Sequence, residues 1–375
     1  MRTSTFLPTL DTASSGHDLR NAPNAAADVE RAFSDEFACV TAGLDVETRR
    51  NSKEGFDEYD GILTGPELLA QLRESFGSDQ LFSAAQLETY AACPFQFYLQ
   101  RVLRIEPDEA PDEEFDPRTR GRILHEALQH FHAAYRGVPV PAIPFEAGRE
   151  TLLRICGDVF DRHAQREISA PRGVVRMERA RIQAQLLRYF DFARGEETSW
   201  KPSHFEVGFG RAHATTDEPL TRPEPFALET DAGTVLLSGR IDRIDTMEGR
   251  ARIVDYKTSL HYQAKDIKEG VSLQLPLYAV ALEEFLMRGV ECAEAQLIQP
   301  GKRKTAEVLQ RDNGKWDERR NAMTQSIARV VSGIRMGAFP PTPHNDRCHV
   351  CGSCRICRYE PWRIERKTST DEPDA

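Results

Sequence analysis

The sequence predicts an α/β fold with an added helical region and a C-terminal cysteine-rich segment. Three strand-like runs begin at His204, Thr234 and Ala251, and segments with apolar residues at helical spacing lie before and after them. The 375 residues are 40% hydrophobic and 29% charged, so the chain can bury the core of one large domain or two small ones.

The first clear helical pattern starts at Ser83, where Gln86 three residues later forms a candidate capping box. Pro94 interrupts this helix and leaves Cys93 at the break, where its side chain can turn toward a metal site. The alternative is a kinked core helix with a buried thiol.

A second helix is expected over roughly residues 121–135, and His125 lies one step off its apolar face. A lone helix histidine is most often solvated or hydrogen bonded, so the pattern alone gives His125 no special role. The apolar face is formed by Leu124, Leu128, Phe131 and Tyr135.

Two more amphipathic helices are expected between about residues 146 and 196. The second carries an arginine run, which is most often a solvated face but is also the best local candidate for contacting phosphates. The net charge of −10 gives no global basic footprint, so any nucleic-acid path must be local. The arginines are Arg176, Arg179, Arg181 and Arg188, and a weaker candidate is formed by Lys302, Arg303 and Lys304.

The two later strand-like runs read as a hairpin with a two-residue turn at Glu248 and Gly249. That register places Asp242 directly opposite Asp255, with Cβ atoms about 5 Å apart, where like charges destabilise the pair unless something compensates them. A divalent cation would compensate. The alternative is a solvated hairpin whose charges face water.

Side chains alternate along a strand, so Asp255 and Lys257 share a face while Tyr256 points to the other. The same alternation places Asp245 on the far face, across from Arg252, as a cross-strand ion pair. A helix is then expected over about residues 272–288. There Gln274 and Tyr278, four residues apart, share one face of what could also be an ordinary core helix.

The eight cysteines are unevenly distributed. Cys348, Cys351, Cys354 and Cys357 crowd together, while Cys93 lies far upstream; Cys39, Cys156 and Cys292 are scattered and read as buried or half-buried side chains. Without a secretory signal, metal ligation is favoured over disulfides. Four thiolates suit either zinc or an iron–sulfur cluster, and spacing alone does not separate the two.

Five segments together resemble the PD-(D/E)xK nuclease superfamily, specifically the RecB/AddB-type nuclease domain with an iron–sulfur cluster. The resemblance runs from about residue 82 to residue 359 and implies a restriction-endonuclease-like core, a central mixed sheet flanked by helices. The segments are SAAQLETYAACPFQFYLQRVLRI, RGRILHEAL, GRIDRID, IVDYKTS with QLPLY, and CHVCGSCRIC.

The resemblance implies that a 4Fe-4S cluster is held by Cys93, Cys348, Cys351 and Cys357, which fit the family spacing. Cys354 is surplus to that pattern and puts the ligand set in doubt. A zinc knuckle formed by the four C-terminal cysteines would leave Cys93 unexplained. In either case the bound group is expected to be structural, because it would tie the ends of the domain together.

The resemblance also implies metal-dependent hydrolysis of DNA phosphodiester bonds by an exonuclease, in repair or recombination beside a helicase acting in trans. Asp242 and Asp255 would hold Mg²⁺ or Mn²⁺, with His125 and the Tyr256 carbonyl as further ligands, and Glu206 is an additional acidic candidate. The expected catalytic set is Asp242, Asp255, Lys257, Gln274 and Tyr278.

Several functions are not expected. The chain lacks a phosphate-binding loop, so it should not bind ATP, and it lacks an apolar run of about 18 residues, which favours a cytoplasmic protein without a membrane span. Two rivals remain: a non-catalytic DNA-binding scaffold and a zinc-dependent interaction module. The expected division is a flexible segment 1–75, a nuclease domain 76–360 and a flexible tail 361–375.

Overall fold

The computed structural model describes residues 34–105, 115–167, 171–210, 218–258, 264–302, 305–311, 314–345, 348 and 351–368. The chain divides into two compact units, one of residues 60–360 and one that takes in the residues before and after them. Among the helices of the described ranges, none combines the length and apolar character of a membrane span.

The smaller unit contains two helices in segments that the sequence suggested were largely flexible. These are α2 (Ser34–Arg50) and α13 (Pro361–Thr368). An ion pair of 2.6 Å between Arg363 and Glu47 joins them. The predicted domain boundaries at residues 75 and 360 remain predictions.

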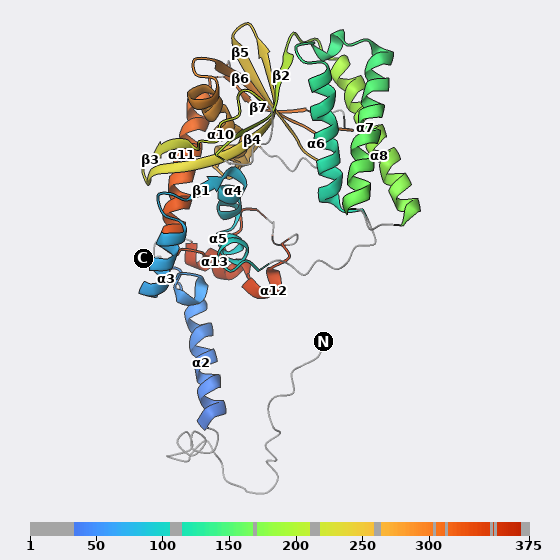
Figure 1. Ribbon diagram of the computed structural model, residues 1–375. Coiled ribbons are helices and arrows are strands. Elements are labelled where there is room, and N and C mark those ends of the chain that lie inside the picture. Colours follow the sequence, from blue (N-terminus) through green and yellow to red (C-terminus); the bar gives the residue numbers. More distant parts are fainter. Residues whose placement is uncertain are drawn as a thin grey trace, which may run out of the picture. The chain divides into compact units, whose positions relative to one another are not determined.

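The larger unit is built on a mixed sheet, as predicted, with seven strands among its described residues (Figure 1). The order is β1-β4-β5-β6-β7, and β2 and β3 also pair with the long strand β4. The β1–β4 and β5–β6 pairs are parallel and the others are antiparallel. The strands are β1 (Leu81–Ser83), β2 (Lys201–Phe209), β3 (Phe226–Thr230), β4 (Gly233–Met247), β5 (Arg250–Tyr256), β6 (Glu291–Ile298) and β7 (Thr305–Gln310).

The predicted hairpin is formed by β4 and β5, and its register is confirmed. Glu248 and Gly249 have φ values of 48° and 80°, the positive values that a tight two-residue turn requires. Asp245 pairs with Arg252, and an Arg252 Nη2 to Asp245 Oδ2 distance of 2.6 Å makes the predicted cross-strand ion pair. The strands therefore present their side chains on the faces that the alternation predicted.

Helices cover both faces of the sheet (Figure 1). On one face, α6, α7 and α8 pack with Val254 and Tyr256, and on the other α4, α10 and α11 pack with Ile253. The helices of this unit are α3 (Pro66–Ser75), α4 (Ala84–Ala92), α5 (Pro94–Phe97), α6 (Pro117–Ala134), α7 (Phe145–Glu167), α8 (Arg172–Arg194), α9 (Ala264–Lys268), α10 (Gln274–Ala281), α11 (Trp316–Arg335) and α12 (Cys354–Cys357). Short π- and 3₁₀-helical turns are η1 (Glu58–Asp60), η2 (Tyr98–Val102), η3 (Val140–Ala142) and η4 (Leu282–Leu286).

Helix ends follow local sequence signals, and two of them differ from expectation. The capping box of Ser83 and Gln86 is present at α4. Helix α6 begins four residues earlier than predicted, because the Asp116 side chain accepts from the first backbone N–H groups and Pro117 fits the first helical position. The helix predicted over 272–288 is shorter, since α10 passes into the π-helical turn η4.

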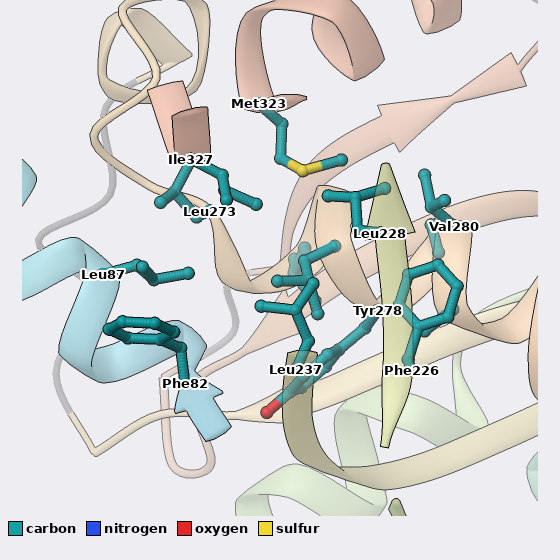
Figure 2. Packing of buried hydrophobic residues seen from close by; sticks show 14 of the residues in the cluster. Phe82, Leu87, Phe226, Leu228, Leu237, Leu273, Tyr278, Val280, Met323 and Ile327 are labelled. Carbon is teal, nitrogen blue, oxygen red and sulfur yellow. The ribbon is translucent and has the colours of Figure 1, made fainter. Parts of the chain in front are cut away.

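The core beneath α10 joins segments distant in sequence. Figure 2 shows Phe82 and Leu87 from the β1–α4 segment beside Leu273, with Tyr278 of α10 near Leu237 of β4. All five side chains belong to one buried cluster. This cluster fixes α4 and α10 relative to β4, the strand that carries Asp242.

Candidate active site and cysteine site

Three potential metal ligands converge from different elements. Asp242 lies on β4, Glu206 on β2 and His125 on α6, and one ligand atom of each lies within 4.8 Å of the others. The His125 Nδ1 is 3.2 Å from the Asp242 Oδ2. Carboxylate oxygens with an imidazole suit a divalent cation such as Mg²⁺ or Mn²⁺.

Glu206 lies at a point of β2 where the backbone leaves the usual strand conformation. The pairs on either side of it, Phe205 with Arg243 and Val207 with Ile241, place it opposite Asp242. Its φ of 52° is in the left-handed region, which a non-glycine residue adopts only when its surroundings impose it. Such strain is typical of functional positions.

Asp255 is held by a different pair of side chains. Its Oδ2 is 2.8 Å from the Lys257 Nζ, and its Oδ1 accepts from the Gln274 Nε2 at 2.8 Å. The Gln274 Oε1 in turn accepts from the Lys257 Nζ at 2.8 Å. The three side chains thus form a closed ring of polar contacts beside Asp242, whose Oδ2 also accepts from the Tyr256 N–H at 2.9 Å.

Tyr278 lies deeper, against the backbone of β4. Its hydroxyl accepts from the Arg240 N–H at 3.3 Å. Gly239 leaves room for the ring, because a Cβ there would lie 2.5 Å from the Tyr278 Cε1. Tyr278 therefore supports the strand that leads to Asp242.

The acidic groups of the site do not ionise equally. Burial and the neighbouring Asp242 raise the pKa of Glu206 to about 7, and the same two causes raise the pKa of Asp255 to about 6. Burial is the largest single influence on Asp242 and opposes its ionisation, but the hydrogen bond and charge of His125, the Tyr256 N–H and the Lys257 charge together outweigh burial and lower that pKa. Carboxylates held this closely repel one another, and a divalent cation would relieve the repulsion.

A buried polar network supports the strand from behind. The Arg243 Nη1 donates to the hydroxyl groups of Tyr256 and Tyr189 at 2.6 and 2.8 Å. It also lies 3.0 Å from the Nε2 of His132, and the Arg243 Nε is 2.8 Å from Asp245. Tyr256 is therefore fixed on the face opposite Asp255, which also fixes the backbone between Asp255 and Lys257.

Cysteines from both ends of the larger unit line one cavity. Burial raises the pKa of the Cys93 thiol to about 11, and the nearby Cys351 and Cys348 add to the rise. Several thiols around one apolar cavity fit a group that takes thiolate ligands, either zinc or an iron–sulfur cluster. The side chain of Cys354 lies outside the described part of the chain. The lining includes Cys93, Cys348, Cys351 and Cys357 with Phe95, Pro341, Pro343 and Tyr359.

The fold and the arrangement of these residues agree with the sequence comparison. The chain matches the family model of the PD-(D/E)XK nuclease superfamily over residues 81–361, which include both hairpin strands and both cysteine segments. The chain belongs to this superfamily.

Relatives of this PD-(D/E)XK chain include large proteins named as ATP-dependent helicase/deoxyribonuclease subunits. The one from Ruminiclostridium cellulolyticum is 27% identical over 228 residues, which are 58% of this chain and 19% of the relative. Proteins of the same name from Acetivibrio thermocellus and Heliobacterium modesticaldum are 28% and 32% identical over 56% and 55% of this chain, and 18% and 17% of their own length. The chain thus spans about one fifth of these relatives.

The predicted basic track of this PD-(D/E)XK chain is largely engaged in internal contacts. Arg179 pairs with Asp161, Arg181 with Glu178, and the Arg188 Nε donates to the Gly301 carbonyl. Exposed Arg176 is the exception within the described part of α8, and Lys302 is also exposed. Arg303 and Lys304 lie outside the described residues.

Sequence reasoning missed two features of this PD-(D/E)XK site. Arg243 and His132 were not predicted to have a role, because these two members of a buried network are 111 residues apart and leave no local pattern. Sequence reasoning also missed Glu88, whose Oε1 accepts from the Leu273 and Gln274 N–H groups at 2.7 and 2.8 Å. The only available signal was an acidic residue on a largely apolar helix.

Proposed function

We propose that this chain is a deoxyribonuclease that uses Mg²⁺ or Mn²⁺ to hydrolyse phosphodiester bonds. The observation that carries the proposal is the ring of Asp255, Lys257 and Gln274 beside the ligand group of Asp242, Glu206 and His125. A scaffold has no need for buried carboxylates that repel one another, so this arrangement favours an enzyme over a non-catalytic DNA-binding protein.

Each of these residues would have its own role in hydrolysis. Asp242 and Asp255 would hold the cation with His125, Glu206 and the Tyr256 carbonyl as further donors. When bound, the cation supplies hydroxide near neutral pH and offsets the charge that develops on the phosphate. The Lys257 ammonium orients the attacking water or pairs with the phosphoryl group.

Gln274 and Tyr278 would position the other catalytic residues. Gln274 holds Lys257 against Asp255, and Tyr278 supports the backbone at Arg240. Both contacts fix the reacting groups before substrate binds, which is how enzymes lower the barrier for phosphoryl transfer.

The cellular role is proposed from the relatives, whose names join a helicase to a deoxyribonuclease. We propose that this chain acts as an exonuclease on DNA presented by a helicase in trans, during repair or recombination. The chain itself is not expected to bind ATP.

We further propose that Cys93, Cys348, Cys351 and Cys357 hold a 4Fe-4S cluster with a structural role. The support is their shared cavity, whose walls are largely apolar. Zinc is the alternative. The visible absorption and the iron and sulfide content of anaerobically purified protein distinguish the two.

The deciding experiment is cleavage of labelled linear single- and double-stranded DNA with Mg²⁺ or Mn²⁺. We expect Asp255→Ala and Lys257→Ala to lower kcat by about 100-fold or more while DNA binding persists. Asp231→Asn, at an exposed turn about 30 Å along β4 from Asp242, is the control. DNA binding without metal-dependent cleavage by the unaltered chain would favour the scaffold.

A further inference from the structure

Glu88 provides a cap for a helix to which it is not connected in sequence. Its Oε1 accepts from the N–H groups of Leu273 and Gln274 at the start of α10, while Leu273 itself offers no side-chain cap. The first N–H groups of a helix lack partners within the helix, and a carboxylate at that end is favoured by the helix dipole. Glu88 of α4 therefore fixes where α10 begins.

The residue fixed in this way is the one that organises the active site. Gln274 donates to Asp255 and accepts from Lys257 through its side-chain amide. Burial lowers the pKa of Lys257, but Asp255, Asp242 and Glu88 together raise it, so the ammonium form is favoured. A displacement of the Gln274 backbone would be passed directly to both of its partners.

Helix α4, which carries Glu88, ends at the cysteine cavity. Cys93 is the residue that follows α4, its N–H donates to the Thr89 carbonyl, and Ala92 and Cys93 both line the cavity. Glu88 precedes Cys93 by five residues, which is about 7 Å along a helix axis. One short rigid element thus carries a cavity thiol at its end and the cap of α10 near its middle.

A second contact reinforces the link from the C-terminal cysteine segment. The His344 N–H donates to the Ala92 carbonyl at 2.7 Å, and the His344 Nε2 is 3.0 Å from the Asp266 Oδ1. The Asp266 carbonyl accepts from the Val271 and Ser272 N–H groups, just before Leu273. The segment that leads into α10 is therefore held through His344, which lies four residues before Cys348 and contacts Ala92, the neighbour of Cys93.

We propose that Glu88 is a positioning residue that connects the cysteine site to the catalytic group, so that filling the cysteine site orders Gln274 and, through it, Asp255 and Lys257. The effect on catalysis rests on the proposed nuclease function. The effect on the backbone at Leu273 and Gln274 does not, and it can be measured separately.

The test combines amide hydrogen exchange with cleavage kinetics on protein purified with its cysteine site filled. In Glu88→Ala we expect the Leu273 and Gln274 amides to exchange about ten-fold faster or more, because each loses a charged acceptor. We expect kcat to fall by a similar factor with the Kd for DNA unchanged. Glu88→Gln keeps an acceptor oxygen and should recover part of both losses.

Cys93→Ser tests the connection itself. It should speed exchange at the same two amides in protein with Glu88 but add nothing further in the Glu88→Ala background. Thr89→Ala, which removes only a hydroxyl bond to Ala85 on the same helix, is the matched control and should leave both readouts unchanged. Hydrogen exchange at the amides of α7 shows whether a variant remains folded. If these amides lose protection in Cys93→Ser, Cys351→Ser is measured in its place.

Three results would overturn the proposal. The first is exchange of the Leu273 and Gln274 amides at the wild-type rate in the cysteine variant. The second is a double variant in which the two substitutions act independently, so that their effects on the exchange rate multiply. The third is an unchanged kcat in Glu88→Ala. If the unaltered chain cuts no DNA, the nuclease function fails while the exchange data still decide whether Glu88 connects the two sites.

Discussion

Asp242 and Tyr256 are joined across the hairpin by a hydrogen bond of 2.9 Å from the Tyr256 N–H to the Asp242 carboxylate. The bond lies just past the last paired residues of β4 and β5, Arg243 and Val254. It holds Asp242 beside the backbone that carries Asp255 at the end of β5. The arrangement depends on the hairpin register, and several consequences of it can be measured.

We expect the ligand group to determine affinity for divalent cations. Asp242→Asn, His125→Ala and Glu206→Gln should each weaken Mn²⁺ binding by about ten-fold or more. The two carboxylate variants lose a negative charge and the histidine variant loses a donor atom, in a group whose ligand atoms already lie within 4.8 Å of one another. Isothermal titration calorimetry measures the effect, with Asp231→Asn as control. Unchanged affinity in all three variants would exclude this group as the metal site.

Gly239→Ala should displace the Tyr278 ring. The added methyl group would lie 2.5 Å from Cε1 of that ring, so we expect a loss of about 1–3 kcal/mol in the free energy of unfolding and a lower kcat. Urea unfolding measures the first effect. Gly173→Ala, where an added Cβ meets nothing within 4 Å, should not destabilise the chain, and equal behaviour of the two variants would contradict the prediction.

The free energy of unfolding should decrease as the pH is lowered, because of His132. Full burial holds the pKa of this ring well below 6.5, and the charges of Arg243 and Arg252 lower it further. Below pH 6.5 the unfolded chain binds a proton at His132 that the folded chain does not, so acidification favours unfolding. The contribution is at most about 1.4 kcal/mol per pH unit.

Comparison with His132→Gln isolates this contribution between pH 6.5 and 5. The variant should be less stable at pH 7 but should lose less stability on acidification than the unaltered chain. Half-exposed His130 lies on the same helix, and His130→Gln is the matched control. Parallel curves for all three proteins would show that His132 is protonated in the folded state.

Substitution of the cavity cysteines should remove the bound group and lower thermal stability. We expect Cys93→Ser and Cys351→Ser to lose visible absorption and to lower Tm by about 5 °C or more, because binding energy contributes to folding. Cys39→Ser changes an exposed thiol of α2 and should have neither effect. Full iron content in Cys93→Ser would remove that residue from the ligand set.

The parts of this fold that were predictable depend on short-range signals. The turn at Glu248 and Gly249 sets the hairpin register, and the register sets the faces of Asp245 and Arg252, so these followed from periodicity. The capping box at Ser83 was predictable for the same reason. The positive φ at Glu206 was not, because it depends on the pairing of β2 with β4 rather than on its neighbours in sequence.

The less predictable parts depend on contacts between distant segments. The cap that Glu88 provides for α10 joins residues 185 and 186 positions apart, and no periodicity records it. The arginines of α8 look like a basic track in sequence, yet Arg179 joins α8 to α7, Arg188 joins it to the loop at Gly301, and Arg181 pairs within α8 itself. A charged residue in a linear sequence does not show whether its partner is DNA or the protein itself.

The walls of the cysteine cavity come from residues 92–96 and 341–359, so they are synthesised far apart in time. While a ribosome translates the intervening region, Cys93 has already emerged without the other thiols of its cavity. Delivery of the proposed metal group to all of these thiols would therefore wait until the distal cysteines leave the exit tunnel, and a nascent chain that stalls earlier would remain without it.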